Sequence, residues 1–135
     1  MRFLKTQKLM KTIQLHTVLP IHPRKIRAFF LTQGVLRLFY DVKSLEKTGH
    51  LSYLVNKKYN AIVYFSNTDI IWEVYSKNDK LRDKIKVFLY TVDDDTGVHL
   101  TFETTRILPL KRSLENEVNS GVELLKDLLD ALRKY

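Results

Sequence analysis

The sequence predicts an α+β fold in which a curved antiparallel sheet of about six to seven strands wraps around one long C-terminal helix. Two observations lead to this fold class. Strand-like segments joined by short, turn-rich links follow one another up to Pro109, and a long run with helical periodicity comes after it. Because short links favour antiparallel neighbours, the strands are expected to form one sheet that covers the apolar face of the helix.

The C-terminal helix is predicted over residues 113–135. Ser113 is placed to cap its first amides, and Glu115 and Glu117 lie at the positive end of its dipole. About 23 residues span roughly 34 Å, so the helix needs a partner surface as large as a sheet. Its apolar residues recur every three or four positions and line one face, namely Leu114, Val118, Val122, Leu125, Leu128 and Leu132.

Length and composition fit one domain over residues 10–135, preceded by a basic extension at residues 1–9. With 135 residues, of which 44% are hydrophobic, the chain supports a single core. The first sustained pattern begins at Met10, which is therefore a candidate natural start. The sequence has no cysteine, which excludes a disulfide framework and thiolate chemistry, and the expected location is the cytoplasm.

The remaining elements follow from alternation and turn residues. A strand is predicted over residues 11–18, and two short helices over residues 24–31 and 35–40. The last hairpin turn is predicted over residues 93–97, closed by Gly97. The strands after the short helices are predicted over residues 42–47, 51–59, 61–65, 70–75, 85–92 and 98–107.

Alternation also assigns an inward face to most strands. The phase containing Trp72 is chosen for its strand because the opposite phase would bury Glu73 unpaired. Phe88 and Tyr90 are then expected on the outer face. The residues predicted to point inward are Leu51, Tyr53, Val55, Ile70, Trp72, Val74, Ile85, Val87, Leu89, Val98, Leu100 and Phe102.

The net charge of +8 is concentrated before the first acidic residue, Asp41, and beyond it the basic and acidic residues balance. A localised positive field attracts anions, which include nucleic acid, anionic lipid headgroups and acidic ligands. The alternative is a solvated extension that only aids solubility. The basic residues of this first part are Arg2, Lys5, Lys8, Lys11, Arg24, Lys25, Arg27 and Arg37.

The order of strand, two short helices, about six more strands and long helix resembles the START-like (helix-grip, SRPBCC) superfamily. The stretch HPRKIRAFFLTQGVLRLFYDVKSLE looks like the part in which these proteins place two short helices and re-enter the sheet. The stretch SLENEVNSGVELLKDLLDALRKY looks like the gripped helix. Within the superfamily, the chain is most similar to a small fatty-acid carrier family of thermoacidophilic archaea. The resemblance implies a hydrophobic cavity between sheet and helix.

Such a cavity would be lined by the inward faces of the strands and the helix. Arg106 shares the phase of Leu100 and Phe102, so it is suited to bind a carboxylate through two parallel hydrogen bonds. Alternatively, the strand ends earlier and Arg106 is exposed at the rim. Tyr53 and Trp72 could hydrogen-bond a ligand head group, or they could be core residues whose polar atoms hydrogen-bond to the backbone. The candidate ligand-binding residues are Leu15, Tyr53, Trp72, Leu89, Leu100, Phe102, Arg106, Val118, Val122 and Leu125.

No metal site, cofactor site or catalytic motif is predicted. The four histidines, His16, His22, His50 and His99, lack the spacing of metal-binding motifs. Residues 93–95 read as a turn, since the distal glutamate of a calcium loop is missing. The sequence contains neither a glycine-rich phosphate loop nor G-x-S-x-G, so the protein is not expected to be an enzyme.

The predicted function is that of an intracellular carrier which encloses a long-chain fatty acid or a similar amphiphile. The basic N-terminal third would allow peripheral contact with an anionic membrane, and no apolar run is long enough to span one. The alternative is an enzyme of the polyketide cyclase or dehydratase type, for which His16, Glu73 and Arg106 would need to converge. A third possibility, nucleic-acid binding, has no recognisable motif, so no nucleic-acid partner is expected.

Overall fold

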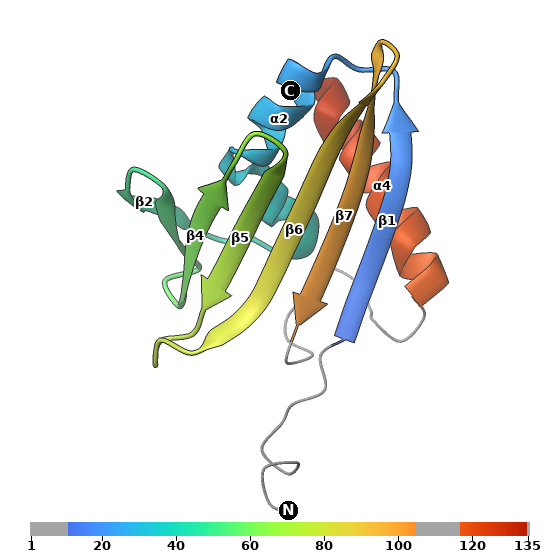
Figure 1. Cartoon of the computed structure of the whole chain (residues 1–135). Coiled ribbons are helices and arrows are strands. Elements are labelled where there is room, and N and C mark those ends of the chain that lie inside the picture. Colours follow the sequence, from blue (N-terminus) through green and yellow to red (C-terminus); the bar gives the residue numbers. More distant parts are fainter. Residues whose placement is uncertain (1–10, 105–116, 135) are drawn as a thin grey trace, which may run out of the picture.

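The computed structural model describes residues 11–104 and 117–134, and within them seven strands form one antiparallel sheet (Figure 1). The strand order is β1-β7-β6-β5-β4-β3-β2, so the first and last strands are neighbours. The elements are β1 (Lys11–Leu19), α2 (Pro23–Phe30), η1 (Gln33–Val35), α3 (Leu36–Phe39), β2 (Leu45–Gly49), β3 (Ser52–Val55), β4 (Tyr59–Phe65), β5 (Asp69–Tyr75), β6 (Leu81–Val92), β7 (Asp95–Thr104) and α4 (Glu117–Lys134).

The helices that the structure describes all lie on one side of the sheet (Figure 1). Helix α4 packs against β1 and also contacts α3, while α2 packs against β6 and β7 (Figure 1). The predicted order of elements is therefore confirmed, as is the antiparallel sheet with a helix across it. The residues predicted as the first turn of the C-terminal helix, including its cap Ser113, lie outside the described residues.

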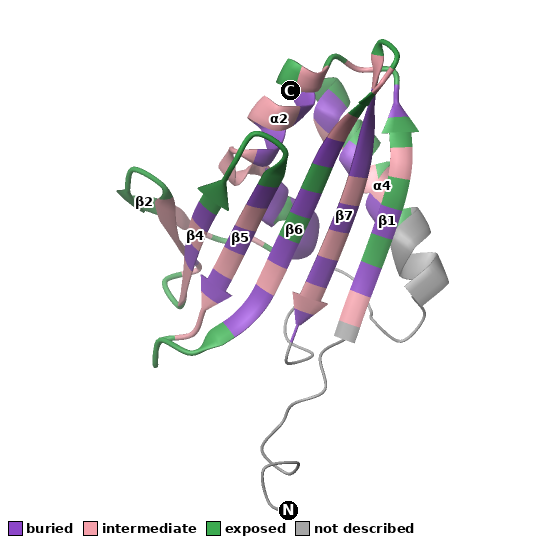
Figure 2. Cartoon of the chain, in the orientation of Figure 1, coloured by how far each residue is buried: buried purple, intermediate pink, exposed green. Residues whose placement is uncertain are grey.

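The core confirms the predicted faces of the central strands. Figure 2 shows buried residues alternating with more exposed ones along β5, β6 and β7. Helix α4 adds Leu124, Leu128 and Leu132, which are four residues apart. Leu124 was not in the predicted apolar stripe, and the predicted Leu125 is only partly buried. The predicted inward residues that are buried are Val55, Ile70, Trp72, Val74, Ile85, Val87, Leu89, Val98, Leu100 and Phe102.

The two turns that flank β3 correct one predicted strand and one residue predicted to point inward. The predicted strand over residues 51–59 is interrupted at Asn56 and Lys57, which adopt positive φ angles of 53° and 58°. Asparagine tolerates this conformation, and the Asn56 side chain also accepts hydrogen bonds from the amides of Lys43 and Ser44. Leu51, predicted inward, is 37% exposed in the β2–β3 turn, because β3 begins only at Ser52.

The last hairpin also differs from its prediction. Its turn contains only Asp93 and Asp94, since Val92 already pairs with Asp95, and Asp93 has a φ of 54°. Gly97 therefore lies within β7, directly opposite Tyr90, and does not close the turn. A Cβ at Gly97 would lie 2.1 Å from Cζ of Tyr90, so this glycine gives the tyrosine ring room to lie across the strand.

Candidate functional site

Most of the sequence-predicted ligand-binding residues are core residues in the structure. Leu15, Trp72, Leu100 and Phe102 are buried, and Tyr53 and Leu125 are partly buried against the same core. Arg106 and the side chains of Val118 and Val122 lie outside the described part of the chain.

Two of these aromatic residues hold the short helices against the sheet. Nε1 of Trp72 donates a hydrogen bond to the carbonyl oxygen of Phe30, 2.8 Å away, at the end of α2. The ring of Phe102 stacks on Phe39 of α3 with centroids 4.4 Å apart. Trp72 thus follows the alternative considered from the sequence, in which its polar atom bonds to the backbone.

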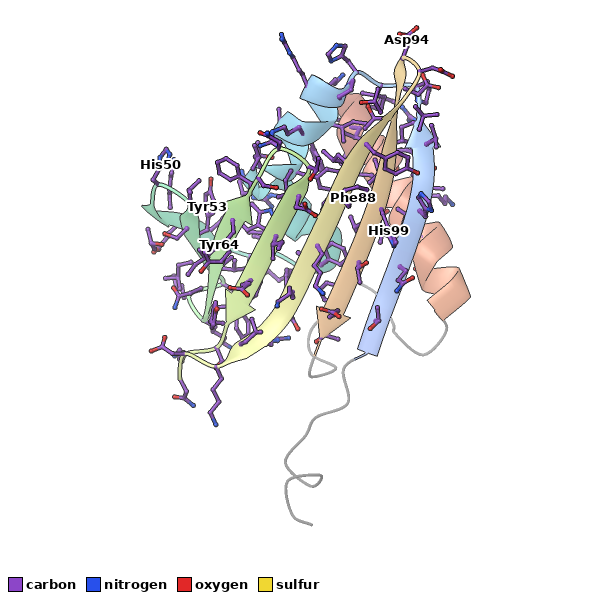
Figure 3. The ribbon with its side chains drawn as sticks, viewed as in Figure 1. His50, Tyr53, Tyr64, Phe88, Asp94 and His99 are labelled. Atoms are coloured by element: carbon purple, nitrogen blue, oxygen red, sulfur yellow. The ribbon has the colours of Figure 1, made fainter. Side chains whose placement is uncertain are left out.

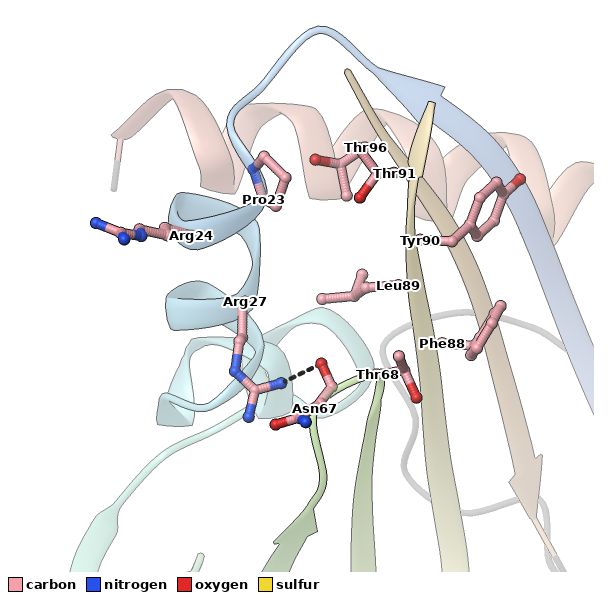
Figure 4. Close-up of a pocket in the computed structure, with 10 residues that line it drawn as sticks. All are labelled: Pro23, Arg24, Arg27, Asn67, Thr68, Phe88, Leu89, Tyr90, Thr91 and Thr96. Carbon is pink, nitrogen blue, oxygen red and sulfur yellow. Dashed lines mark hydrogen bonds between the residues drawn. The ribbon is translucent and has the colours of Figure 1, made fainter. Parts of the chain in front are cut away.

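A pocket of about 400 Å³ opens between α2 and β6. It is open to solvent, and Figure 4 shows Leu89 pointing across it toward α2. Of the sequence-predicted ligand-binding residues whose side chains the structure describes, Leu89 alone lines this pocket. The described residues that line it are Pro23, Arg24, Arg27, Asn67, Thr68, Phe88, Leu89, Tyr90, Thr91 and Thr96.

The pocket exists because β6 is longer than its neighbour β5. Pairing between the two strands ends at Asp69 and Phe88, and the amide of Leu89 makes one further hydrogen bond of 2.9 Å to the carbonyl of Thr68. From there β6 continues to Val92 without β5 beside it. Helix α2 faces this uncovered edge, so a gap remains between helix and strand (Figure 4).

Local sequence signals position α2 at the pocket. Nδ1 of His22 accepts a hydrogen bond from the amide of Arg24 and caps the helix, and Pro23 follows at its first position. The buried residues Ile26, Phe29 and Phe30 hold one face of α2 against the core, which leaves Arg27 beside the pocket.

Arg27 is the cation that faces the pocket. Its Nη1 donates a hydrogen bond of 3.1 Å to the carbonyl oxygen of Asn67, and its guanidinium carbon lies 5.6 Å from the centre of the Phe65 ring. Arg24 extends away from Leu89 (Figure 4). From the sequence, Arg24 and Arg27 were predicted only to contribute to the N-terminal positive charge. The turn that brings Asn67 to α2 is distant in sequence, so no local pattern indicates this contact.

A second cluster, buried and charged, lies toward the other end of β6. Arg82 and Asp83 are 1% and 0% exposed, with Nε of Arg82 3.3 Å from Oδ2 of Asp83. The hydroxyl of Tyr40 donates a hydrogen bond to the same carboxylate oxygen. The guanidinium carbon of Arg82 lies 4.4 Å from the centre of the Tyr59 ring. The charges are thus stabilised by each other and by aromatic contacts.

A β-bulge explains how two consecutive residues are both buried. Val74 pairs with Asp83, whereas the next residue, Tyr75, pairs with Leu81. Arg82 is therefore the extra residue on β6, and the strand bends so that neighbouring side chains both turn inward. The predicted strand began only at residue 85, so Arg82 and Asp83 were assigned to neither face of the sheet. Simple alternation extended to Arg82 would also have placed it on the outer face.

Tyr40 makes the stability of the protein sensitive to alkaline pH. Burial, followed by the charge of Asp83 and the hydrogen bond to it, raises the pKa of Tyr40 well above 10.0. Above pH 10.0 the unfolded chain loses the phenolic proton while the folded chain keeps it, so stability is expected to fall as pH rises toward the folded-state pKa.

Denaturant titrations of the wild type and Tyr40→Phe across this alkaline range measure the effect. The variant is expected to lose about 1–3 kcal/mol at neutral pH because Asp83 loses a donor, and its stability should decline less steeply above pH 10.0. Tyr64→Phe, at an exposed site, is the control. An unchanged alkaline slope in Tyr40→Phe would contradict the role given to Tyr40.

The described part of the chain holds no group of three or more histidine, cysteine, aspartate or glutamate side chains placed to bind a metal ion. His22 serves as the α2 cap, and His50 is exposed in the β2–β3 turn. Of the helices in residues 11–104 and 117–134, none has the length and apolar character needed to cross a membrane.

The sequence matches no protein-family model and no curated protein. Solved structures do resemble it. Protein CV1439 from Chromobacterium violaceum has 12% identity and a TM-score of 0.58, over 91% of this chain and 95% of that one. The Aha1 dimer from Colwellia psychrerythraea has 16% identity and a TM-score of 0.56, over 88% and 91%. CalU16 from Micromonospora echinospora has 11% identity and a TM-score of 0.54, over 93% and 85%.

Identities this low show a shared fold and nothing finer. The sheet order, the short helices after β1 and the C-terminal helix agree with that likeness. The narrower resemblance to archaeal fatty-acid carriers is not among the findings of these comparisons. The chain therefore has the START-like, helix-grip fold that its sequence predicted.

Proposed function

We propose that the protein binds an amphiphile with an anionic head group, such as a long-chain fatty acid, in the pocket between α2 and β6 and acts as its carrier. The observation that carries this proposal is the position of Arg27, whose guanidinium group lies beside the open pocket of about 400 Å³ lined by Leu89 and Phe88. Pockets of this size that combine apolar walls with a few polar groups are typical small-molecule sites.

The electrostatics of the pocket favour an anion. Among the described residues, no carboxylate lies within ion-pair distance of Arg27, and its one hydrogen bond to the carbonyl of Asn67 leaves other N–H groups available. Arg24 and Lys25 on the same helix add positive charge. A carboxylate at the mouth would therefore gain charge-assisted hydrogen bonds. These cations would also favour docking on an anionic membrane surface.

The apolar part of the ligand would cover exposed hydrophobic surface. Leu89 and Pro23 line the gap beside α2, and Phe88, which is 43% exposed, lines the pocket from the opposite face of β6 (Figure 4). Full burial of a methylene contributes about 0.8 kcal/mol, or roughly fourfold in affinity. Because the pocket is open, we expect a smaller increment in affinity, about twofold for each methylene, until the chain extends beyond the apolar lining.

Arg27→Gln should weaken fatty-acid binding about tenfold, since it removes the charge that faces the carboxylate. The measurement is a calorimetric titration of delipidated protein with saturated fatty acids of increasing length. Lys25→Gln is the matched control, because it removes the same charge from the same helix at an exposed side chain that is not among the residues lining the pocket.

Fatty alcohols of the same length separate the head group from the chain. They should bind the wild type and Arg27→Gln equally, because they carry no negative charge. Equal loss of fatty-acid affinity in Lys25→Gln and Arg27→Gln would contradict the placement of the head group and indicate a general charge effect. Absence of binding by any fatty acid would overturn the proposal.

An enzyme of the cyclase or dehydratase type remains the second candidate, and the buried Arg82–Asp83 pair with Tyr40 is the observation in its favour. That function would require His16, Glu73 and Arg106 to meet in a cavity, and two of these residues do not lie in one. His16 and Glu73 lie on the outer face of the sheet, where Glu73 pairs with Lys84 at 3.6 Å. Arg106 is outside the described residues. The carrier is therefore the preferred function.

A further inference from the structure

Two histidines face each other on the outer side of the sheet. His16 of β1 and His99 of β7 are direct cross-strand partners, and their rings stack with centroids 5.1 Å apart and an angle of 15° between planes. His16 is exposed and His99 is half-buried. Figure 3 shows His99 and Phe88 on the side of the sheet opposite α4. Both imidazoles are thus accessible from solvent at one place.

Tyr90 of β6 reaches this pair across β7. Its partner on β7 is Gly97, which has no side chain, so the tyrosine ring lies over the strand. The Tyr90 hydroxyl is then hydrogen-bonded to Nε2 of His16, two strands away from its own. An oxygen partner of this kind sets the orientation of an imidazole ring, which is how residues around metal ligands act.

We infer that His16 and His99 bind one divalent transition-metal ion, Cu²⁺, Ni²⁺ or Zn²⁺, and that Tyr90 positions the His16 ring for it. Imidazole nitrogen is a preferred ligand of these ions. With metal–nitrogen bonds of about 2.0–2.1 Å, two ligand nitrogens in a tetrahedral site lie about 3.3 Å apart. With Nε2 of His16 held by Tyr90, Nδ1 of His16 would be its ligand atom. Rotation of the His99 side chain would bring a ring nitrogen to this separation from it, and water would complete the coordination.

The surroundings do not oppose a cation. The next outward-facing pair on these strands is Gln14 and Thr101, both uncharged. On β6, Lys86 is the partner of Thr101, and its ammonium group is paired with Glu103 at 3.2 Å. The site does not depend on the proposed lipid ligand, although Tyr90 also contributes to that pocket.

Calorimetric titration of the untagged full chain with Cu²⁺, Ni²⁺ and Zn²⁺ at neutral pH tests the site. One ion should bind per chain, with Cu²⁺ tightest, and the electron paramagnetic resonance spectrum of the Cu²⁺ form should show two imidazole nitrogens. His16→Gln and His99→Gln should each lower the affinity at least about tenfold, and Tyr90→Phe should lower it about tenfold with both ligands kept.

His50→Gln is the matched control, since it removes an exposed histidine from the β2–β3 turn, away from β1 and β7. It should leave the affinity unchanged, and far-ultraviolet circular dichroism should show all variants folded. A single coordinated nitrogen in the Cu²⁺ spectrum would overturn the inference. So would equal losses of affinity in His50→Gln and His99→Gln.

Discussion

Replacing Asp83 with alanine is expected to lower the free energy of unfolding by about 3–5 kcal/mol. The substitution takes away the carboxylate 3.3 Å from Nε of Arg82, and the guanidinium group remains in a site that is 1% exposed. It also removes the acceptor of the Tyr40 hydroxyl. Chemical denaturation of the wild type and the variant at neutral pH measures the difference.

Two further variants separate the buried pair from an ordinary ion pair. Glu73→Gln breaks the more exposed pair with Lys84 and should cost less than about 1 kcal/mol. The double variant Arg82→Met/Asp83→Leu should recover much of the stability that Asp83→Ala loses, because no unpaired charge remains in the core. If Asp83→Ala cost no more than Glu73→Gln, the described burial of the pair would be wrong.

Trp72→Ala is expected to destabilise the protein by about 3–5 kcal/mol. Trp72 is fully buried, so truncation leaves a large cavity between β5 and the short helices, and the carbonyl of Phe30 loses its donor. Trp72→Phe retains most of the packing and should cost about 1–3 kcal/mol, mainly through the lost hydrogen bond. Thermal and denaturant unfolding measure both changes.

Because Phe30 ends the helix that carries Arg27, the Trp72 hydrogen bond also supports the proposed ligand pocket. Trp72→Phe should therefore weaken fatty-acid binding while the protein stays folded. Tyr64→Ala, which truncates a 50% exposed aromatic residue on β4, is the control and should alter stability by less than about 0.5 kcal/mol. A large loss of stability in Tyr64→Ala together with a small loss in Trp72→Ala would contradict the described core.

The faces of the central strands were predictable because they depend on a local rule. Successive side chains on a strand point to opposite sides, so the phase containing Ile70, Trp72 and Val74 follows once Glu73 is placed outside. The same reasoning holds for Ile85 and Val87. These residues indicate which side of the sheet faces the helices even when the order of the strands is unknown.

The ligand-binding residues were predicted less accurately, because a cavity depends on contacts between distant segments and not on a local rule. An inward-facing residue lines a cavity only if no other element fills the space in front of it. Trp72 and Phe102 face inward as predicted, but Phe30 and Phe39 from the short helices occupy that space. The pocket lies instead where β6 extends beyond β5, and strand lengths of this kind are set by pairing between distant segments.

The sequence by itself determined the order of the elements, the antiparallel sheet with its C-terminal helix and the buried face of each central strand, since periodicity and turn residues act within a few positions. Only the tertiary structure decided the bulge that buries Arg82 beside Asp83, the approach of Arg27 to the gap at Leu89, and the meeting of His16 with His99. Each of these depends on strand register and on contacts between segments far apart in the chain, which local patterns do not encode.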